Sequence, residues 1–213
     1  MFLEFFLVKK KVRELIDSYF QDENDNVLDL GAGDNPHYHD KIKGKIVSFD
    51  LKKTDSTHVV GDAGSVPFKK DSFDAVVSIN SFYYFNNPFD SEKEISRVLK
   101  KKGKLFLMMP FMYPIHDVPF DKYRFTEYGI RKLFEKDFDI KELGVIGGIF
   151  NIKAVFFHSL IKGLKFVLPR PIAFVFAILL WPFYFLAQLI SLLDFFDRTR
   201  RWPTYYYLVA IKK

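Results

Sequence analysis

The chain contains no cysteine, which excludes two kinds of stabilising chemistry at once. Without thiols it can form neither a disulfide framework nor a thiolate metal site. Histidine is scarce as well, because only five are scattered over the 213 residues, with no spacing typical of metal ligands. We therefore expect no metal centre, and the lack of disulfides is compatible with a reducing compartment.

A secretory signal is not expected either. The charges Lys9, Lys10 and Lys11 follow the first apolar run, and Glu4 interrupts that run. A signal peptide has the opposite order, with its cations before an unbroken apolar segment. We expect the bulk of the protein to stay in the cytoplasm.

Charged residues are missing from Pro171 to Leu193, a stretch long enough to cross a bilayer. The formal charge of +6 gathers around it, in Lys162, Lys165 and Arg170 before it and Arg198, Arg200 and Arg201 after it. The 26 phenylalanines and 11 tyrosines crowd into apolar segments rather than alternating with cations along a groove. This distribution predicts contact with a membrane surface and no nucleic-acid partner.

Strands and helices alternate along the rest of the chain. Apolar residues at helical spacing predict helices at 3–20, about 90–100 and about 126–135. Short β-branched and apolar runs predict seven strands, at 26–30, 45–50, 57–60, 74–79, 104–109, 139–147 and 204–211. Such alternation predicts an α/β, Rossmann-like, doubly wound and mostly parallel sheet, with residues 1–150 and 203–213 as one domain.

The strand at 26–30 runs into a glycine turn, and Asp50 ends the next strand. Gly31 and Gly33 allow a sharp turn and a close approach to a ligand, while an acid at the tip of the neighbouring strand can accept both hydroxyls of a ribose. A dinucleotide fold would have Gly or Ala in place of Pro36, and Asp34 would repel a pyrophosphate. A cationic nucleoside fits better, and S-adenosylmethionine carries a sulfonium and an ammonium group.

Three further blocks follow in order: Gly61-Asp62-Ala63-Gly64-Ser65-Val66-Pro67-Phe68, then Asp71-Ser72-Phe73-Asp74-Ala75-Val76-Val77-Ser78, then Arg97-Val98-Leu99-Lys100 with Gly103-Lys104-Leu105-Phe106-Leu107. With the glycine turn, they resemble the class I S-adenosylmethionine-dependent methyltransferases over residues 20–145 and again in the last ten. The resemblance implies an antiparallel last strand. It also implies a set of cofactor-binding residues: Asp29, Gly31, Ala32, Gly33, Asp50, Leu51, Asp62, Ala63 and Asn80.

Within that set, the resemblance assigns Asp62 and the Ala63 backbone to the adenine. Asp29 either holds the glycine turn or reaches the methionine end of the cofactor, and Asn80 could touch that same end. Each acid also has a structural alternative, because Asp50 could cap the turn that follows it and Asp62 could be a turn residue. Asn35 stands where a third glycine is common and can adopt the same left-handed turn.

The segment 109–126 after the fifth strand is similar to a Pro-Phe-x-Tyr-Pro-x-His…Asp-x-Tyr-Arg pattern in a methyltransferase branch associated with cell-envelope glycans and lipids. A neutral His116 could take the proton of an attacking hydroxyl. Tyr123 and Arg124 could orient an acidic or phosphorylated acceptor. Alternatively, His116 is structural and Arg124 simply pairs with Asp121 or Asp117.

One departure from the family concerns the segment after the fourth strand. Many relatives have Glu-His where this chain has Tyr83-Tyr84. An acid–base role at that place is therefore not expected, and the acceptor pocket should be more aromatic and its acceptor partly apolar.

Residues 151–202 form a hydrophobic helical insertion between the last two strands. If those strands share a sheet, the chain must enter and leave the insertion on the same side of the membrane. Basic residues lie on both flanks of the insertion, and this indicates that both flanks face the cytoplasm. We expect the insertion to lie in the membrane interface or dip in and out, with Pro182 as a bend. Its first part should be an amphipathic helix, with Ile152, Val155, Phe156, Leu160 and Leu164 on one face and His158, Lys162 and Lys165 on the other.

Together these features predict a methyltransferase on the cytoplasmic face of a membrane that O-methylates a lipid or a lipid-linked glycan. Two alternatives remain open at this stage. The insertion could be a lid or a homodimer interface on a soluble enzyme with a small-molecule substrate, or the chain could be a non-catalytic, membrane-tethered binding module.

Overall fold

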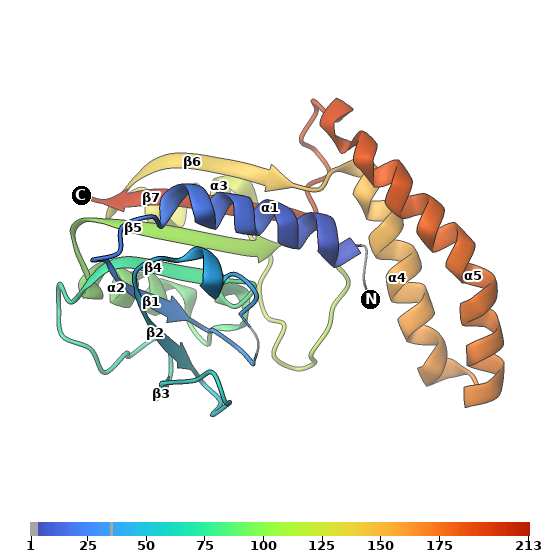
Figure 1. Cartoon of the computed structure of the whole chain (residues 1–213), viewed down its shortest axis with the longest axis horizontal. Coiled ribbons are helices and arrows are strands. Elements are labelled where there is room, and N and C mark those ends of the chain that lie inside the picture. The colour runs from blue at the N-terminus through green and yellow to red at the C-terminus, as the bar shows by residue number, and fades with distance from the viewer. Residues whose placement is uncertain (1–3, 35) are drawn as a thin grey trace. The chain divides into compact units, whose positions relative to one another are not determined.

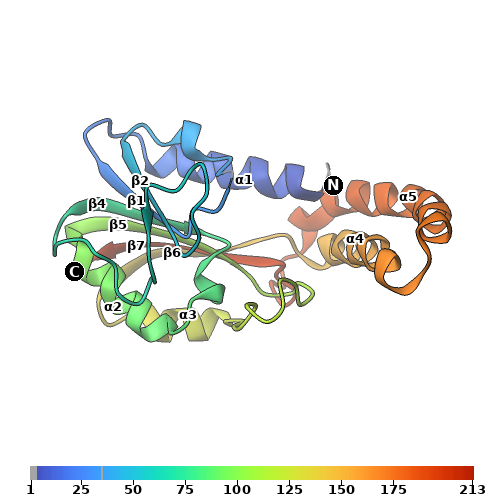
Figure 2. The same cartoon turned by 90° about the horizontal axis from the view of Figure 1, so that it is seen from below.

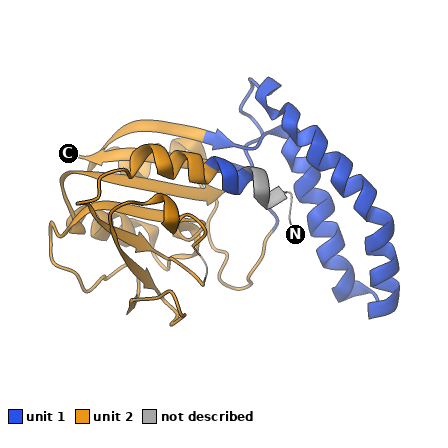
Figure 3. Cartoon of the chain, viewed as in Figure 1, with its two compact units in different colours: residues 1–11, 112–114, 145–205 blue, residues 12–111, 115–144, 206–213 orange. Residues whose placement is uncertain are grey.

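The computed structural model describes residues 4–34 and 36–213. Asn35, at which the sequence predicts a left-handed turn, lies outside the described residues. The chain divides into two compact units (Figure 3). The sheet unit comprises Val12–Phe111, Ile115–Gly144 and Tyr206–Lys213, and the hairpin unit comprises Met1–Lys11, Met112–Pro114 and Val145–Tyr205.

A seven-stranded sheet has the order β3-β2-β1-β4-β5-β7-β6 (Figure 1). The strands are β1 (Asn26–Leu30), β2 (Lys45–Asp50), β3 (Val59–Val60), β4 (Phe73–Ile79), β5 (Leu99–Pro110), β6 (Phe138–Ile146) and β7 (Tyr205–Lys212). Pairing is parallel from β3 to β5, with Leu28 opposite Val47 on one side and Val76 on the other. The last strand, β7, runs antiparallel between β5 and β6. The predicted Rossmann-like fold, including its antiparallel last strand, is confirmed.

Helices cover both faces of the sheet unit (Figure 2). The part of α1 (Glu4–Tyr19) from Val12 onward lies on one face, while α2 (Pro88–Val98) and α3 (Glu127–Phe134) lie on the other. Asn87 caps α2 by accepting hydrogen bonds from the Phe89 and Asp90 amides. Thr126 caps α3 through the Gly129 amide, 3.1 Å away. Side-chain caps thus fix where each helix starts.

The core lies between these layers and the sheet. Its fully buried aromatic residues come from strands, helices and loops alike: Phe20, Phe49, Phe82, Phe106, Phe134 and Phe138. Phe20, which follows α1, meets Phe106 of β5 edge to face with ring centroids 6.4 Å apart. Six of the 26 phenylalanines therefore pack fully buried in the core of the sheet unit.

The hairpin unit consists mainly of two antiparallel helices, α4 (Ile149–Val167) and α5 (Arg170–Ser191), followed by η3 (Leu192–Phe196) (Figure 1). Asp194 accepts hydrogen bonds from the Phe150 and Asn151 amides at 2.9 and 3.2 Å, which caps the start of α4. Pro182 lies inside α5, and the helix is continuous through it rather than broken there.

The predicted amphipathic face of α4 is wrong in detail. His158 and Val155 are both buried, whereas Phe156 and Leu160 are exposed. The buried imidazole meets the ring of Tyr184 in α5, with centroids 6.0 Å apart. Because α5 packs on the face that carries His158, this imidazole lies inside the hairpin, whereas Lys162 and Lys165 are exposed and the apolar Phe156 and Leu160 point outward.

Candidate active site at the carboxyl ends of the strands

The glycine turn after β1 packs closely against the segment that follows β4. Gly31 has a φ of +81°, and a Cβ on it would lie 2.4 Å from Cβ of Ser81. Gly33 has a φ of +66° with open space where a Cβ would be. The amides of Gly31 and buried Ala32 donate to the Phe49 carbonyl oxygen at 2.7 and 3.2 Å. Only glycine fits at Gly31, and the space beside Gly33 leaves the backbone accessible to a ligand.

Asp29 is fully buried beneath this turn. The Tyr38 hydroxyl donates to both of its carboxylate oxygens at 2.9 Å, and Nε2 of His39 lies 2.5 Å from Oδ2. Burial raises the pKa of Asp29, although the hydrogen bonds from His39 and Tyr38 oppose that shift. Of its two predicted roles, the one visible in the geometry is to hold the loop that continues from the glycine turn.

Asp50 at the end of β2 bridges two backbone amides. Its Oδ2 accepts from the Gly33 amide and its Oδ1 from the Lys52 amide, each at 2.9 Å. The turn-capping alternative is therefore realised, and the same carboxylate also holds the glycine turn. Each oxygen can accept a second hydrogen bond, so the ribose role stays a prediction. Leu51 beside it is exposed, as a residue that packs on a ligand would be.

Asp62, after β3, is likewise engaged within the chain. Its Oδ1 accepts from the Gly64 amide at 2.7 Å, and its Oδ2 accepts from Nδ2 of Asn86 at 2.6 Å. The neighbouring Ala63 is buried. The turn role is thus present, and adenine recognition through Asp62 and Ala63 stays a prediction.

Asn80 at the end of β4 offers a buried acceptor. Its φ of +53° is left-handed, and its amide donates to the Met108 carbonyl oxygen at 2.9 Å. Its Oδ1 is buried and has no hydrogen-bond partner among the described residues. A buried acceptor without a donor is costly, so this atom fits a ligand that brings its own donor, such as the ammonium group of S-adenosylmethionine.

His116 lies in a short chain of polar groups. Its Nε2 is 3.1 Å from the hydroxyl of Tyr83, its Nδ1 is 3.3 Å from Oδ2 of Asp121, and its backbone amide donates to the same Oδ2 at 3.1 Å. Because a carboxylate only accepts hydrogen bonds, the neutral imidazole must carry its proton on Nδ1. Nε2 is then the basic nitrogen, and it faces the Tyr83 hydroxyl.

Arg124 pairs with Asp121, which is one of the alternatives left open by the sequence. Its two terminal nitrogens bond the two carboxylate oxygens, NH2 to Oδ2 at 2.6 Å and NH1 to Oδ1. The guanidinium also lies 5.1 Å from the centre of the Tyr83 ring. Burial acts to raise the pKa of Asp121, but the Arg124 hydrogen bonds lower it overall, so the carboxylate stays charged beside His116.

Asn86 connects the loop after β5, which carries Tyr123, to Asp62 at the predicted adenine side of the site. Its carbonyl oxygen accepts from the Tyr123 hydroxyl at 3.2 Å, and its side-chain oxygen accepts from Lys122. Because Asn86 also donates to Asp62, the segment after β4 connects the loops after β3 and β5. The predicted residues from β1 to β5 thus gather at the carboxyl edge of the sheet.

Four contributors to the site were not among the predicted residues: Tyr38, His39, Tyr83 and Asn86. Tyr83 had a sequence signal, since it departs from the family pattern, but that signal argued against a role. Tyr84 beside it donates to Asp117 at 2.8 Å. The other three act through contacts between loops, which the spacing of residues in the sequence does not predict. No group of three or more His, Asp or Glu suited to a metal ion occurs in the described part of the chain.

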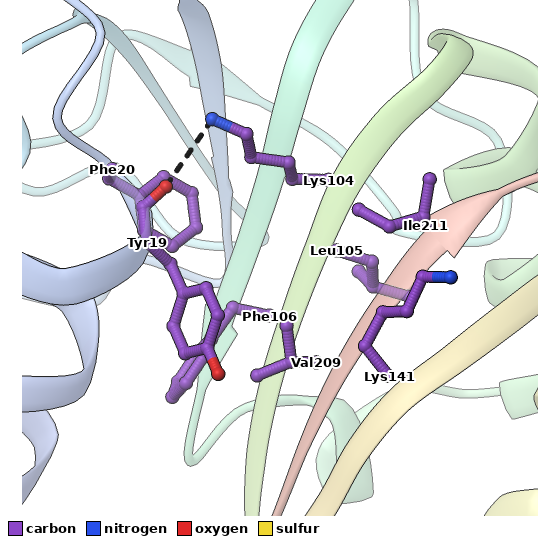
Figure 4. A pocket seen from close by; sticks show the side chains of 8 residues that line it. All are labelled: Tyr19, Phe20, Lys104, Leu105, Phe106, Lys141, Val209 and Ile211. Carbon is purple, nitrogen blue, oxygen red and sulfur yellow. Dashed lines mark hydrogen bonds between the residues drawn. The ribbon is translucent and has the colours of Figure 1, made fainter.

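A cavity of about 120 Å³ lies elsewhere in the sheet unit, between the end of α1 and strands β5, β6 and β7 (Figure 4). Its lining is almost entirely apolar, and Nζ of Lys104 donates to the Tyr19 carbonyl oxygen at 3.4 Å. Lys104 and Leu105 lie at the middle of β5, away from its carboxyl end at Pro110. This cavity is a packing gap rather than part of the site.

Residues 28–107 match the family model described as a methyltransferase domain. A demethylmenaquinone methyltransferase of Thermotoga maritima is 30% identical over 114 residues, which cover 47% of this chain and 48% of that protein. The chain therefore matches about half the length of this curated relative.

Solved methyltransferases share the fold. A phosphoethanolamine N-methyltransferase 2 of Haemonchus contortus, solved with S-adenosyl-L-methionine, has a TM-score of 0.59 at 16% identity, over 95% of this chain and 52% of that chain. A SAM-dependent methyltransferase of Aquifex aeolicus has a TM-score of 0.51 at 16% identity, over 64% of this chain and 82% of that one. Residues 28–107 thus match a methyltransferase domain, and the chain shares its fold with solved methyltransferases.

Proposed function

We propose that this protein transfers the methyl group of S-adenosylmethionine to an oxygen of a lipid or lipid-linked glycan at the cytoplasmic face of a membrane. The observation that carries the proposal is the meeting of Gly33, Asp50 and Asn80 at one edge of the sheet, inside the segment that matches a methyltransferase domain. A ligand with a ribose and an ammonium group satisfies the groups found there.

The cofactor, when bound, supplies an electrophilic methyl group on a sulfonium. The chain's own residues hold the rest of it. Asp50 accepts the ribose hydroxyls with the lone pairs that Gly33 and Lys52 leave over, and Oδ1 of Asn80 accepts from the ammonium group. Asp29, tied to Tyr38 and His39, keeps the glycine turn in place rather than meeting the ligand.

His116 is the base of the proposed reaction. Its Nε2 lone pair receives the proton of the acceptor hydroxyl, through the Tyr83 hydroxyl or in its place, and Asp121 stabilises the imidazolium that results. The Asp121 carboxylate then lies between two cations, the imidazolium and the Arg124 guanidinium, so the cluster carries one net positive charge until His116 releases the proton. Methyl transfer needs little more than positioning and this proton acceptor.

A lipid or lipid-linked acceptor is favoured by the surface of the hairpin unit. The helical segment Arg170–Phe196 is long and apolar enough to cross a membrane, judged by length and composition alone. Its most apolar 18 residues have a mean hydropathy of 2.1, and 22% of them are buried. A soluble enzyme with a small-molecule substrate has no need for so much exposed apolar surface. The branch resemblance of residues 109–126 points to the same class of acceptor.

The test is to incubate the full-length protein with membrane lipid and glycan extracts and with S-adenosylmethionine labelled in its methyl group. Mass spectrometry should find the label in a lipid or lipid-linked product, attached through oxygen. Label only in water-soluble products would indicate the small-molecule alternative. Cofactor binding without transfer to any extract would indicate a binding module.

A further inference from the structure

We infer that the α4–α5 hairpin is a monotopic anchor, which lies in the plane of the membrane and embeds in one leaflet rich in anionic lipid. The inference deepens the proposed function and rests on it for the place of the acceptor. It is carried by three observations on the hairpin unit: the width of its apolar surface, its charge and the positions of its lysines.

The apolar surface of α5 is too wide for contact with one partner helix. The residues that it buries share a narrow stripe against α4: Ala173, Tyr184, Ala187, Gln188 and Ser191. The exposed apolar residues of α5 extend around the helix from Trp181 through Phe174 and Leu179 to Phe176, an arc of about 220° at about 100° per residue. A packing face is about 100° wide, so a second protein surface would leave half of this arc in water. The hydrocarbon of a membrane leaflet can cover the whole arc.

The uncharged polar groups at the start of α4 and at His158 are directed toward the interior of the hairpin. The amides at the start of α4 donate to Asp194 and Asp197, and the His158 ring lies against Tyr184. Backbone groups within the two helices satisfy each other, which is the condition for placing a segment in hydrocarbon. The hairpin can therefore enter lipid without leaving its backbone unpaired.

Charge in the chain is divided between the two units. The hairpin unit holds ten Lys and Arg but three Asp and Glu, whereas the sheet unit holds 22 and 23. The entire positive surplus of the protein therefore belongs to the unit with the apolar helix. Two of its three acids, Asp194 and Asp197, are engaged as helix caps. A cationic rim around an apolar surface complements a leaflet of anionic lipid.

The lysines of α4 determine how the hairpin lies. Lys153, Lys162 and Lys165 are all exposed, and the first and last are about 18 Å apart along the helix. If α4 crossed the bilayer, Lys162 or Lys165 would have to pass through its centre, which is costly for a charge. In a helix parallel to the surface, Lys162 and Lys165 lie about 60° apart around the axis, so both can reach the headgroups on one side.

The first experiment measures flotation of the purified full-length protein with vesicles of phosphatidylcholine alone or mixed with phosphatidylglycerol. Binding should be tighter to the mixed vesicles and weaker at high salt. Replacing Arg198, Arg200 and Arg201 by Gln should lower partition onto anionic vesicles roughly 100-fold, because each cation near the surface contributes about fivefold. A matched triple, Lys43→Gln, Lys101→Gln and Lys102→Gln in the sheet unit, should bind as the native protein does.

A second pair of variants tests the apolar arc. Phe174→Ser with Leu179→Ser should reduce binding to both kinds of vesicle, whereas Phe89→Ser with Tyr128→Ser, which removes equally exposed apolar groups from the sheet unit, should not. All four side chains are exposed, so the variants should fold. Circular dichroism and binding of S-adenosylmethionine check that they do.

Single cysteines at Lys165 and at Arg201 then test the orientation, since the native chain has no cysteine. On vesicles bound from outside, both should react with a membrane-impermeant thiol reagent. Protection of the cysteine at 165 alone would overturn the in-plane arrangement in favour of a two-span hairpin. Equal vesicle binding by the two triple variants would overturn the anionic-leaflet assignment.

Failure of this inference can be told apart from failure of the proposed function. Vesicle binding needs no methyl acceptor, so native binding without methyl transfer would count against the function alone. Methyl transfer by a protein that stays off both kinds of vesicle, and sediments as a dimer, would count against the anchor alone.

Discussion

At the scale of single residues, the candidate site is built from carboxylates that already hold backbone. Asp50 spans the Gly33 and Lys52 amides, and Asp62 spans the Gly64 amide and Asn86. A carboxylate oxygen accepts two hydrogen bonds, so a structural bond and a ligand bond can share it. The structural and the binding roles that compete in the sequence are therefore compatible in the folded chain.

Asp50→Ala should weaken binding of S-adenosylmethionine by about 2–3 kcal/mol, because two hydrogen bonds to the ribose are lost at about 1–1.5 kcal/mol each. Titration calorimetry measures this directly. Asp55→Ala, an exposed acid in the same loop, is the matched control and should leave the affinity unchanged. Native affinity in Asp50→Ala, or tighter binding of NAD than of S-adenosylmethionine, would refute the cofactor assignment.

Asp121→Asn should reduce the turnover number of methyl transfer by about 100-fold or more, with cofactor affinity intact. An amide can donate to Nδ1 of His116, which would move the imidazole proton to Nε2 and remove the basic nitrogen. Nitrogen-15 NMR of the imidazole should show the proton on Nδ1 in the native protein and on Nε2 in the variant.

Asp117→Asn provides the comparison, because Asp117 accepts from Tyr84 and lies next to His116 in the sequence. It should keep both the turnover number and the tautomer. His116→Ala should match Asp121→Asn in turnover, and a native rate in either variant would leave His116 with a structural role only.

At the scale of elements, the strands could be predicted closely and the loops could not. Strands β1 and β2 fall at the predicted residues because apolar runs and flanking polar turns define them locally. Tyr83 and His116 are in contact although they are 33 residues apart, and the periodicity of apolar residues in a sequence does not predict such long-range contacts. Likewise, the packing of α5 against His158 decided which face of α4 is buried.

Glu92 in α2 should make the stability of the fold depend on pH. Burial, with the nearby Asp137 carboxylate, raises its pKa from 4.5 to about 7, so the folded state binds a proton that the unfolded state releases. The protein should therefore lose stability as the pH rises from about 4.5 to 7. Glu92→Gln should raise the free energy of unfolding at pH 8 by about 2–3 kcal/mol and change it little at pH 4.

Urea unfolding at the two pH values measures this effect. Glu94→Gln on the same helix should have the opposite sign, because the hydrogen bonds of Arg97 lower the pKa of Glu94 and its charge stabilises the fold at neutral pH. A stabilisation by Glu92→Gln that was the same at both pH values would exclude titration as its cause.

At the scale of the whole molecule, the two units differ in charge and in the roles that we propose for them. All predicted cofactor residues belong to the sheet unit, while the surplus positive charge and the exposed apolar helix belong to the hairpin unit. The composition reveals that the chain has a positive and apolar part. Only the fold shows that the sheet unit is nearly neutral. The cationic hairpin unit combines residues 1–11 with 145–205, which are far apart in the sequence.

This separation predicts that the triple replacement of Arg198, Arg200 and Arg201 by Gln leaves the affinity for S-adenosylmethionine within about twofold of native. All three belong to the hairpin unit, and screened surface charges outside the sheet unit should contribute little to cofactor binding. Calorimetry in detergent without vesicles measures it. A tenfold loss would mean that the two units share the cofactor site.

The position of β7 also has a consequence for the order of events during synthesis. This strand follows the hairpin in the chain yet lies between β5 and β6 in the sheet. The apolar helices are therefore synthesised before the residues that complete the sheet. The hairpin that we propose as an anchor can therefore meet a lipid surface before β7 takes its place between β5 and β6.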